Sequence, residues 1–139
     1  MNRGGIGARG GRMTQVILIG LGGLIGAVGR YALAGLVQDW TQNFSFPYGT
    51  LVVNAAGCLT IGFVSYLAEA RGFLSGEARA AVFIGLLGGF TTFSTFMNES
   101  FLLLREGEIL PAAANIVGQV VLGLGAVWLG RAVAFVIWR

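Results

Sequence analysis

The side chains of this chain that are best suited to interact with a solute are neutral amides. Asn54, Asn115 and Gln119 lie within long apolar stretches, where an amide has to find a partner or water. Asn115 and Gln119 are four residues apart, so they share one face of a helix. Together the three indicate a neutral polar track along which something small and hydrated could move. Hydrogen bonding between helices is the alternative interpretation of each residue.

A second candidate lies in an apolar stretch where Gly88-Gly89 is followed by Thr91-Thr92. Adjacent Gly residues weaken a helix, and Thr hydroxyls compete for its carbonyls. A local break would free backbone carbonyls, which are hard oxygen ligands suited to a cation. Irregular backbone at membrane depth is tolerated only where it is buried in protein or lines a cavity. A continuous helix with a small-residue face is the alternative, and these residues by themselves favour it.

A stripe of phenylalanines runs through the same segment. Phe90, Phe93 and Phe96 recur every third residue, so they share one helix face. Packing or lipid contact is the ordinary use of such a stripe. The phenyl ring has a negative face and a positive edge, so rings presented edge-on could instead coordinate an anion without any formal charge.

The chain is too poor in charge to coat a water-exposed surface. Of its 139 residues, 55% are hydrophobic and 11% are charged, whereas soluble domains carry about 25% charge. The sequence holds no His and a single Cys, Cys58. This excludes a catalytic His, a His/Cys zinc cluster and a disulfide framework within one chain. The nucleotide-binding pattern GxxxxGK[ST] is also missing from the sequence, so we expect a passive membrane protein and not an enzyme.

Four apolar stretches predict an all-α membrane protein with four transmembrane helices. They are residues 16–37, 48–68, 80–104 and 110–136, and each reaches the roughly 20 residues needed to cross a bilayer core of about 30 Å. Residues 14–139 are therefore expected to form a single transmembrane domain. Residues 1–13 are rich in Gly and Arg, and we expect a disordered extension there, with Met13 as an alternative start. A cleaved signal peptide is disfavoured because Arg30 precedes the Ala-Leu-Ala site.

Small residues predict how the helices pack. In lipid, helices associate by close approach of their backbones, which small residues permit. Gly22-x-x-x-Gly26 and Gly85-x-x-x-Gly89 supply such faces in the first and third stretches. Further glycines thin the fourth stretch in the same way: Gly118, Gly123, Gly125 and Gly130.

The Arg residues are distributed unequally between the two ends of the predicted bundle. With four spans, both termini lie on the same side of the membrane. Arg30 and Arg105 fall near the opposite side. The remaining Arg residues fall on the side of the termini: Arg3, Arg9, Arg12, Arg71, Arg79, Arg131 and Arg139. The positive-inside rule therefore places the termini in the cytoplasm.

Three motifs identify a family. In chain order they are Gly22-Gly23-x-x-Gly26-Ala27-x-x-Arg30-Tyr31, Pro47-x-Gly49-Thr50-x-x-Val53-Asn54-x-x-Gly57-Cys58 and Gly85-x-x-Gly88-Gly89-x-Thr91-Thr92-Phe93-Ser94-Thr95-Phe96-x-x-Glu99. At these residues the sequence resembles the small bacterial fluoride channels of the Fluc/CrcB type. The resemblance runs from the first apolar stretch to the fourth, with matching lengths.

The resemblance implies an antiparallel, dual-topology dimer with two fluoride pathways at its interface. It also implies that the third helix is broken near the middle of the membrane. There the backbone carbonyls of Gly88 and Thr91 from both subunits would hold a central, structural Na⁺. The implied pathway residues are Asn54, Phe93, Phe96, Thr50, Ser94, Thr95, Asn115 and Gln119. Arg30 and Glu99 match family positions without a firm role.

The resemblance further implies a fluoride-selective passive channel of the bacterial inner membrane, which exports cytoplasmic fluoride and relieves its toxicity. Its partners would be fluoride, the lipid bilayer and a second subunit, with no nucleic acid. The second subunit would be an identical chain in the opposite orientation or an oppositely oriented paralogue. A small antiparallel proton-coupled exporter is the alternative, and Glu99 is the one titratable acid that could serve it. A purely structural adaptor would leave the Asn, Thr and Phe constellation unexplained.

Overall fold

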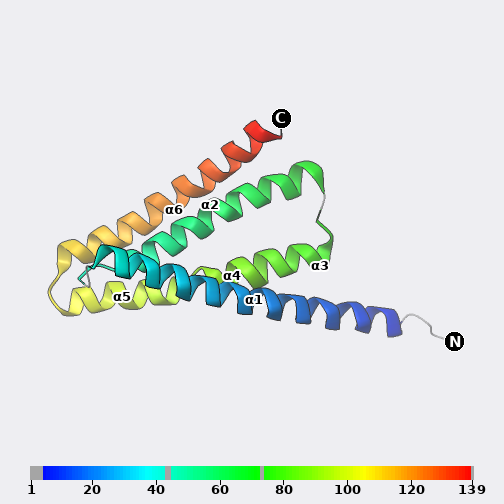
Figure 1. Cartoon of the computed structure of the whole chain (residues 1–139), viewed down its shortest axis with the longest axis horizontal. Coiled ribbons are helices and arrows are strands. Elements are labelled where there is room, and N and C mark those ends of the chain that lie inside the picture. The colour runs from blue at the N-terminus through cyan, green and yellow to red at the C-terminus, as the bar shows by residue number, and fades with distance from the viewer. Residues whose placement is uncertain (1–4, 43–44, 73, 139) are drawn as a thin grey trace.

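The computed structural model describes residues 5–42, 45–72 and 74–138, and over these residues the chain is helical without strands. In chain order, the helices are α1 (Gly5–Thr41), α2 (Tyr48–Arg71), α3 (Gly76–Arg79), the π-helical segment η1 (Ala80–Leu87), α4 (Gly88–Phe90), α5 (Phe93–Arg105) and α6 (Ile109–Ile137) (Figure 1). The segments α3, η1, α4 and α5 follow one another along one interrupted rod, so the described residues form four long rods.

All four rods have the length and composition of membrane spans. The candidate spans are Gly11–Thr41, Tyr48–Ala70, Gly76–Arg105 and Ile109–Ile137, and we refer to Gly76–Arg105 as the third span. Each is longer than the roughly 20 residues that a bilayer core requires. The prediction of an all-α protein with four spanning helices is confirmed.

Helix α1 includes part of the Gly/Arg-rich amino-terminal segment. Helix α1 begins at Gly5, so residues 5–13 are helical, whereas residues 1–4 of the expected extension lie outside the described residues. Once a helix is nucleated, each further residue adds a hydrogen bond at little cost. The long apolar part of α1 provides that nucleus, and the helix continues from it into the Gly/Arg segment.

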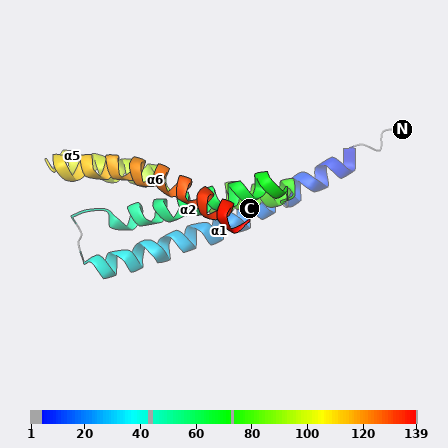
Figure 2. The ribbon, with the colours of Figure 1, turned by 90° about the horizontal axis from the view of Figure 1, so that it is seen from above.

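Helix α2 is the central element. It packs against α6 on one side and α1 on the other, while α1 also packs along η1 and α4. Seen from above, α1 and the α5–α6 pair lie on opposite sides of α2 (Figure 2). The amino-terminal part of α1 and the carboxyl-terminal parts of α2 and α6 point toward one end of the bundle, and the α5–α6 turn lies at the other (Figure 1). The third span therefore packs against α1 through its α3, η1 and α4 segments and against α6 through α5.

The contact between α1 and the third span consists of backbone against backbone. A Cβ on Gly22 would lie 2.6 Å from the Ala81 carbonyl oxygen, and one on Gly89 would lie 2.6 Å from the Gly23 carbonyl oxygen. A Cβ on Gly26 would overlap the Leu86 carbonyl oxygen. The predicted small faces of the first and third stretches therefore pack against each other, as small residues do in membrane helices.

Glycine also brings α2 and α6 together. A Cβ on Gly130 would overlap the Leu59 carbonyl oxygen, whereas a Cβ on Gly125 would meet open space. The predicted thinning of the fourth stretch thus serves a helix contact at Gly130 and not at Gly125. Nearer the ends of these two helices, Arg131 Nη2 lies 2.6 Å from Glu69 Oε2 in an exposed ion pair.

The third span is interrupted at two threonines. Thr91 (φ −82°, ψ 158°) and Thr92 (φ −149°, ψ 107°) are extended between α4 and α5. The Thr91 N–H and hydroxyl both donate to the Leu87 carbonyl, at 3.0 and 2.9 Å. Thr92 caps α5, because its Oγ1 accepts from the Thr95 N–H at 3.4 Å. At the interruption, α4 therefore ends with its last turn hydrogen-bonded by Thr91, and α5 begins with Thr92 as its N-cap.

Candidate functional site

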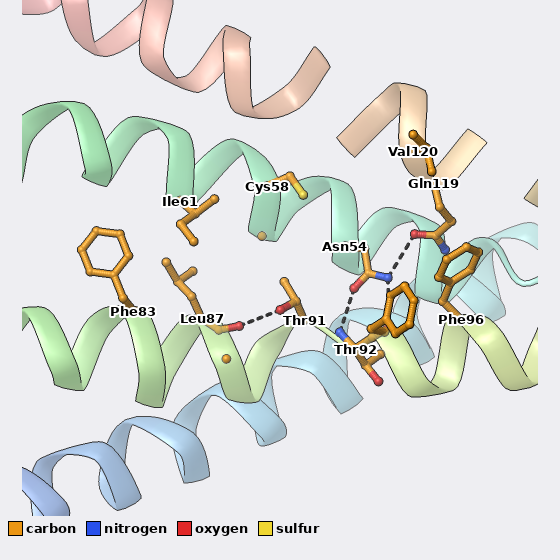
Figure 3. Close-up of a pocket in the computed structure, with 13 residues that line it drawn as sticks. Asn54, Cys58, Ile61, Phe83, Leu87, Thr91, Thr92, Phe96, Gln119 and Val120 are labelled. Carbon is orange, nitrogen blue, oxygen red and sulfur yellow. Dashed lines mark hydrogen bonds between the residues drawn. The ribbon is translucent and has the colours of Figure 1, made fainter. Parts of the chain in front are cut away.

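A cavity of about 370 Å³ lies beside the interruption, between α2, the third span and α6 (Figure 3). Most of its wall is apolar. The residues that bear on its chemistry are Asn54, Gly88, Thr91, Phe93, Phe96 and Gln119. They come from positions far apart in the sequence, and all were predicted as site residues. An apolar cavity with a few convergent polar groups is typical of a binding or transport site.

Asn54 connects α2 to the interruption. Its Oδ1 accepts from the Thr92 N–H at 2.9 Å, and its Nδ2 donates to the Thr92 carbonyl at 3.2 Å. Nδ2 also donates to Gln119 Oε1 at 3.0 Å. One side chain therefore bonds both backbone groups of an extended residue and reaches α6 as well (Figure 3).

The interruption changes which groups the carbonyls of Gly88 and Thr91 meet. In a continuous helix these carbonyls would accept from the N–H groups of Thr92 and Thr95. Here the Thr92 N–H donates to Asn54 and the Thr95 N–H donates to the Thr92 hydroxyl. Both carbonyls have lost their helical donors, and both residues line the cavity.

Gln119 presents an unengaged donor. Its Oε1 accepts from Asn54, while its Nε2 is buried without a hydrogen-bond partner. A buried N–H group without a partner costs free energy, on the order of 1–3 kcal/mol. Gln119 lines the cavity, so a small acceptor that reaches Nε2 from there would meet an unengaged donor.

Two of the phenylalanines that line the cavity, Phe93 and Phe96, have different environments. Phe96 is 5% exposed, whereas Phe93 is 73% exposed. Their ring centroids are 5.7 Å apart with an interplanar angle of 75°, an edge-to-face pair. Ser94 and Thr95 are exposed beside them, and Thr95 Oγ1 accepts from the Thr92 hydroxyl at 2.8 Å. Phe93 therefore forms an open side of the site, and Phe96 forms its wall.

Asn115 lies outside this cavity although it shares a helix face with Gln119. It is fully buried, and its Nδ2 donates to Ser100 Oγ at 3.0 Å. The Ser100 hydroxyl in turn donates to the Phe96 carbonyl at 2.8 Å. Asn115 Oδ1 is buried without a partner. Ser100 is absent from the sequence-predicted set, and its position four residues after Phe96 is the signal that could have found it.

We predict that Ser100→Ala destabilises the protein by about 1–2 kcal/mol, because it leaves the buried Asn115 amide without an acceptor. Equilibrium unfolding in mixed detergent micelles measures the change. Thr60→Ala is the matched control, since the exposed Thr60 hydroxyl bonds only its own helix at Ala56, and we expect a change within about 0.5 kcal/mol. Equal losses in both variants would contradict a special role of Ser100.

Thr50 and Glu99 form a separate polar pair nearer the end of the bundle where α5 meets α6. The Thr50 hydroxyl donates to Glu99 Oε1 at 2.7 Å, and Glu99 Oε2 is buried without a partner. Both residues line a second cavity of about 660 Å³, together with Tyr31 and Asp39. Arg30 makes no ion pair within the described part of the chain. The structure thus joins Glu99 to Thr50 and leaves it apart from Arg30.

A metal site built from side chains finds no support among the described residues. No group of three or more His, Cys, Asp or Glu side chains is close enough together to hold an ion in that part of the chain. Any cation at this site would depend on backbone and amide oxygens.

Comparison with known proteins shows to which family the chain belongs. A family model described as CrcB-like protein, Camphor Resistance (CrcB), matches residues 17–131. The chain belongs to the CrcB family. A curated protein of Methylobacillus flagellatus, named fluoride-specific ion channel FluC, is 49% identical over 118 residues, which cover 85% of this CrcB chain and 92% of that protein. A second, fluoride-specific ion channel FluC 1 of Methanosarcina acetivorans, is 50% identical over 119 residues, with coverages of 86% and 89%.

Proposed function

We propose that this CrcB chain is a subunit of a fluoride channel of the cell membrane, through which fluoride leaves the cytoplasm down its gradient. The observation that carries the proposal is the neutral cavity at the interruption, whose lining residues include amide and hydroxyl groups and phenyl rings but no charged side chain. A cationic side chain that touches the anion would hold it, whereas conduction requires that the ion also leave. The curated relatives are named for fluoride.

The site offers what a small, strongly hydrated anion needs on losing its water. The unpaired Gln119 Nε2 supplies an N–H donor, and the edges of Phe93 and Phe96 supply a weak positive field. We assign Asn54 to the border of this pathway and the remaining polar residues to its continuation: Thr50, Ser94, Thr95 and Asn115. No covalent step is needed, so the chain acts as a conduit and not as an enzyme.

We further propose that the pathway is completed by a second subunit in the opposite orientation. In the single chain, Phe93 is 73% exposed at the open side of the cavity, so the wall is incomplete on that side. An antiparallel partner would place a second interruption opposite the first, at mid-membrane. The partner is a second copy of this chain or an oppositely oriented paralogue, and mapping the orientation of the termini in cells separates the two.

The carbonyls of Gly88 and Thr91 fit a structural Na⁺ at the centre of such a dimer. Their helical N–H donors are engaged elsewhere, and carbonyl oxygens are the hard ligands that alkali cations take in membrane proteins. Two carbonyls from each of two subunits would supply four ligands. When bound, the ion would contribute a fixed positive charge that favours an anion nearby in a low-dielectric setting.

Fluoride efflux from proteoliposomes tests the function. With a potassium ionophore to balance charge, we expect the purified protein to release trapped fluoride without a proton gradient. Liposomes without protein, and liposomes loaded with chloride, are the controls. Efflux that depends strictly on a proton gradient would favour an exporter that uses Glu99. No efflux from a folded dimer would contradict the channel.

A further inference from the structure

All hydrogen-bonding groups of the Asn54 amide are engaged within the chain. An Asn side chain has two N–H donors and one carbonyl acceptor. The two donors serve the Thr92 carbonyl and Gln119 Oε1, and the acceptor takes the Thr92 N–H. An anion in the cavity would have to break one of these bonds to meet the Asn54 amide. The Nε2 of Gln119 has no such competitor.

The hydrogen bonds of Asn54 offset the free-energy cost of the interruption. An extended residue inside a spanning rod leaves its N–H and carbonyl without helical partners, and an unsatisfied backbone group is strongly unfavourable in lipid. Asn54 satisfies both groups of Thr92 from a position 38 residues earlier in the chain. Without this side chain, the Thr92 N–H regains its bond to the Gly88 carbonyl if the helix closes, because that is its partner in a continuous helix.

We infer that Asn54 is the positioning residue of the proposed sodium site, holding Thr92 extended so that the Gly88 carbonyl stays free, while Gln119 supplies the donor that meets fluoride. The inference rests on the proposed function. It assigns different roles to the side chains of Asn54 and Gln119, although one hydrogen bond joins them. Asn54 acts on the backbone of the third span, and Gln119 acts on the ion.

Sodium-dependent stability of the purified full-length dimer tests this division. The melting temperature is followed while Na⁺ replaces a large organic cation, for wild type, Asn54→Leu and Gln119→Leu. Each variant removes one end of the same Asn54–Gln119 bond and keeps an apolar side chain in its place. We expect Asn54→Leu to raise the sodium midpoint roughly 10- to 100-fold, as is usual when a group that orients metal ligands is lost. Gln119→Leu should keep the wild-type midpoint and lose fluoride flux.

Two further variants keep the test decisive. Asn54→Ala repeats it with a smaller side chain if Asn54→Leu does not assemble. Asn54→Asp retains an oxygen for the Thr92 N–H, so its sodium midpoint should lie closer to wild type than that of Asn54→Leu. An unchanged midpoint in Asn54→Leu with lost flux would overturn the inference and make Asn54 a fluoride ligand. Equal weakening in Asn54→Leu and Gln119→Leu would also overturn it.

The same experiment separates the inference from the function on which it rests. A wild-type dimer that conducts no fluoride, yet shows sodium-dependent stability that Asn54→Leu removes, refutes the channel and supports the positioning role. A wild-type dimer that conducts fluoride without any sodium-dependent stability supports the channel and overturns the positioning role.

Discussion

Phe93→Ala should lower fluoride flux by about tenfold or more while leaving the fold and the dimer intact. Phe93 is 73% exposed in the single chain, so its removal leaves no cavity in the packed interior of the subunit. In the proposed pathway, its ring edge would help to replace the water of the ion. Losing about 1.4 kcal/mol of stabilisation at the barrier is enough for a tenfold decrease in rate.

Phe101→Ala is the matched control for Phe93→Ala. Both phenylalanines belong to α5 and both are largely exposed, but Phe101 does not line the cavity. Initial rates of fluoride efflux from proteoliposomes, at equal protein density, measure the effect, and size-exclusion chromatography reports on the dimer. Wild-type flux in Phe93→Ala, or equal losses in the two variants, would refute a direct role of this ring. Phe96→Ala is less informative, because truncating a buried Phe costs about 3–5 kcal/mol of stability.

Gly26→Val should abolish the assembled subunit. A Cβ at this position overlaps the Leu86 carbonyl oxygen and lies 2.8 Å from the Phe90 backbone nitrogen. Both contacts are with backbone atoms, which cannot move aside as the end of a flexible side chain can. Overpacking commonly costs about 1–3 kcal/mol, and here α1 has to separate from η1 and α4. We expect the cost to exceed this range, because the displaced segment leads directly into the interruption.

Gly20→Val controls for the substitution itself. Gly20 lies on the same helix, and a Cβ there has no neighbour within 4 Å. The yield of monodisperse protein after detergent extraction, and the melting temperature of what is recovered, measure both variants. We expect Gly20→Val to behave like wild type. A fully assembled and conducting Gly26→Val protein would show that α1 does not pack on the third span through this face.

Much of the fold could be predicted because its determinants are local. A membrane span depends on a run of apolar residues, and each predicted stretch lies in a candidate span of the structure, the third of them interrupted at Thr91 and Thr92. Gly22-x-x-x-Gly26 and Gly85-x-x-x-Gly89 could be assigned to close packing because lipid gives helices few other ways to associate. The sequence did not show which helix each of these faces would contact. The tertiary structure decided that the two faces pack against each other and not against α2 or α6.

The candidate site could be predicted only in part. The motifs singled out Asn54, Phe93 and Phe96, and these residues do line one cavity. Helical spacing assigned Asn115 and Gln119 to one face, but a face does not determine a partner. Gln119 reaches Asn54, whereas Asn115 reaches Ser100, a residue that no motif indicated.

The sequence by itself determined that this chain crosses a membrane on four apolar helices and that the polar groups nearest the middle of these helices are neutral amides and hydroxyls. The tertiary structure decided which of these groups are already engaged and which remain available. The conformation of Thr92 illustrates the reason. Its local sequence is compatible with a continuous helix, and the extended form is satisfied only because Asn54, on another helix, supplies both of its hydrogen-bonding partners. Such a contact depends on how α2 lies against the third span, which no local pattern specifies.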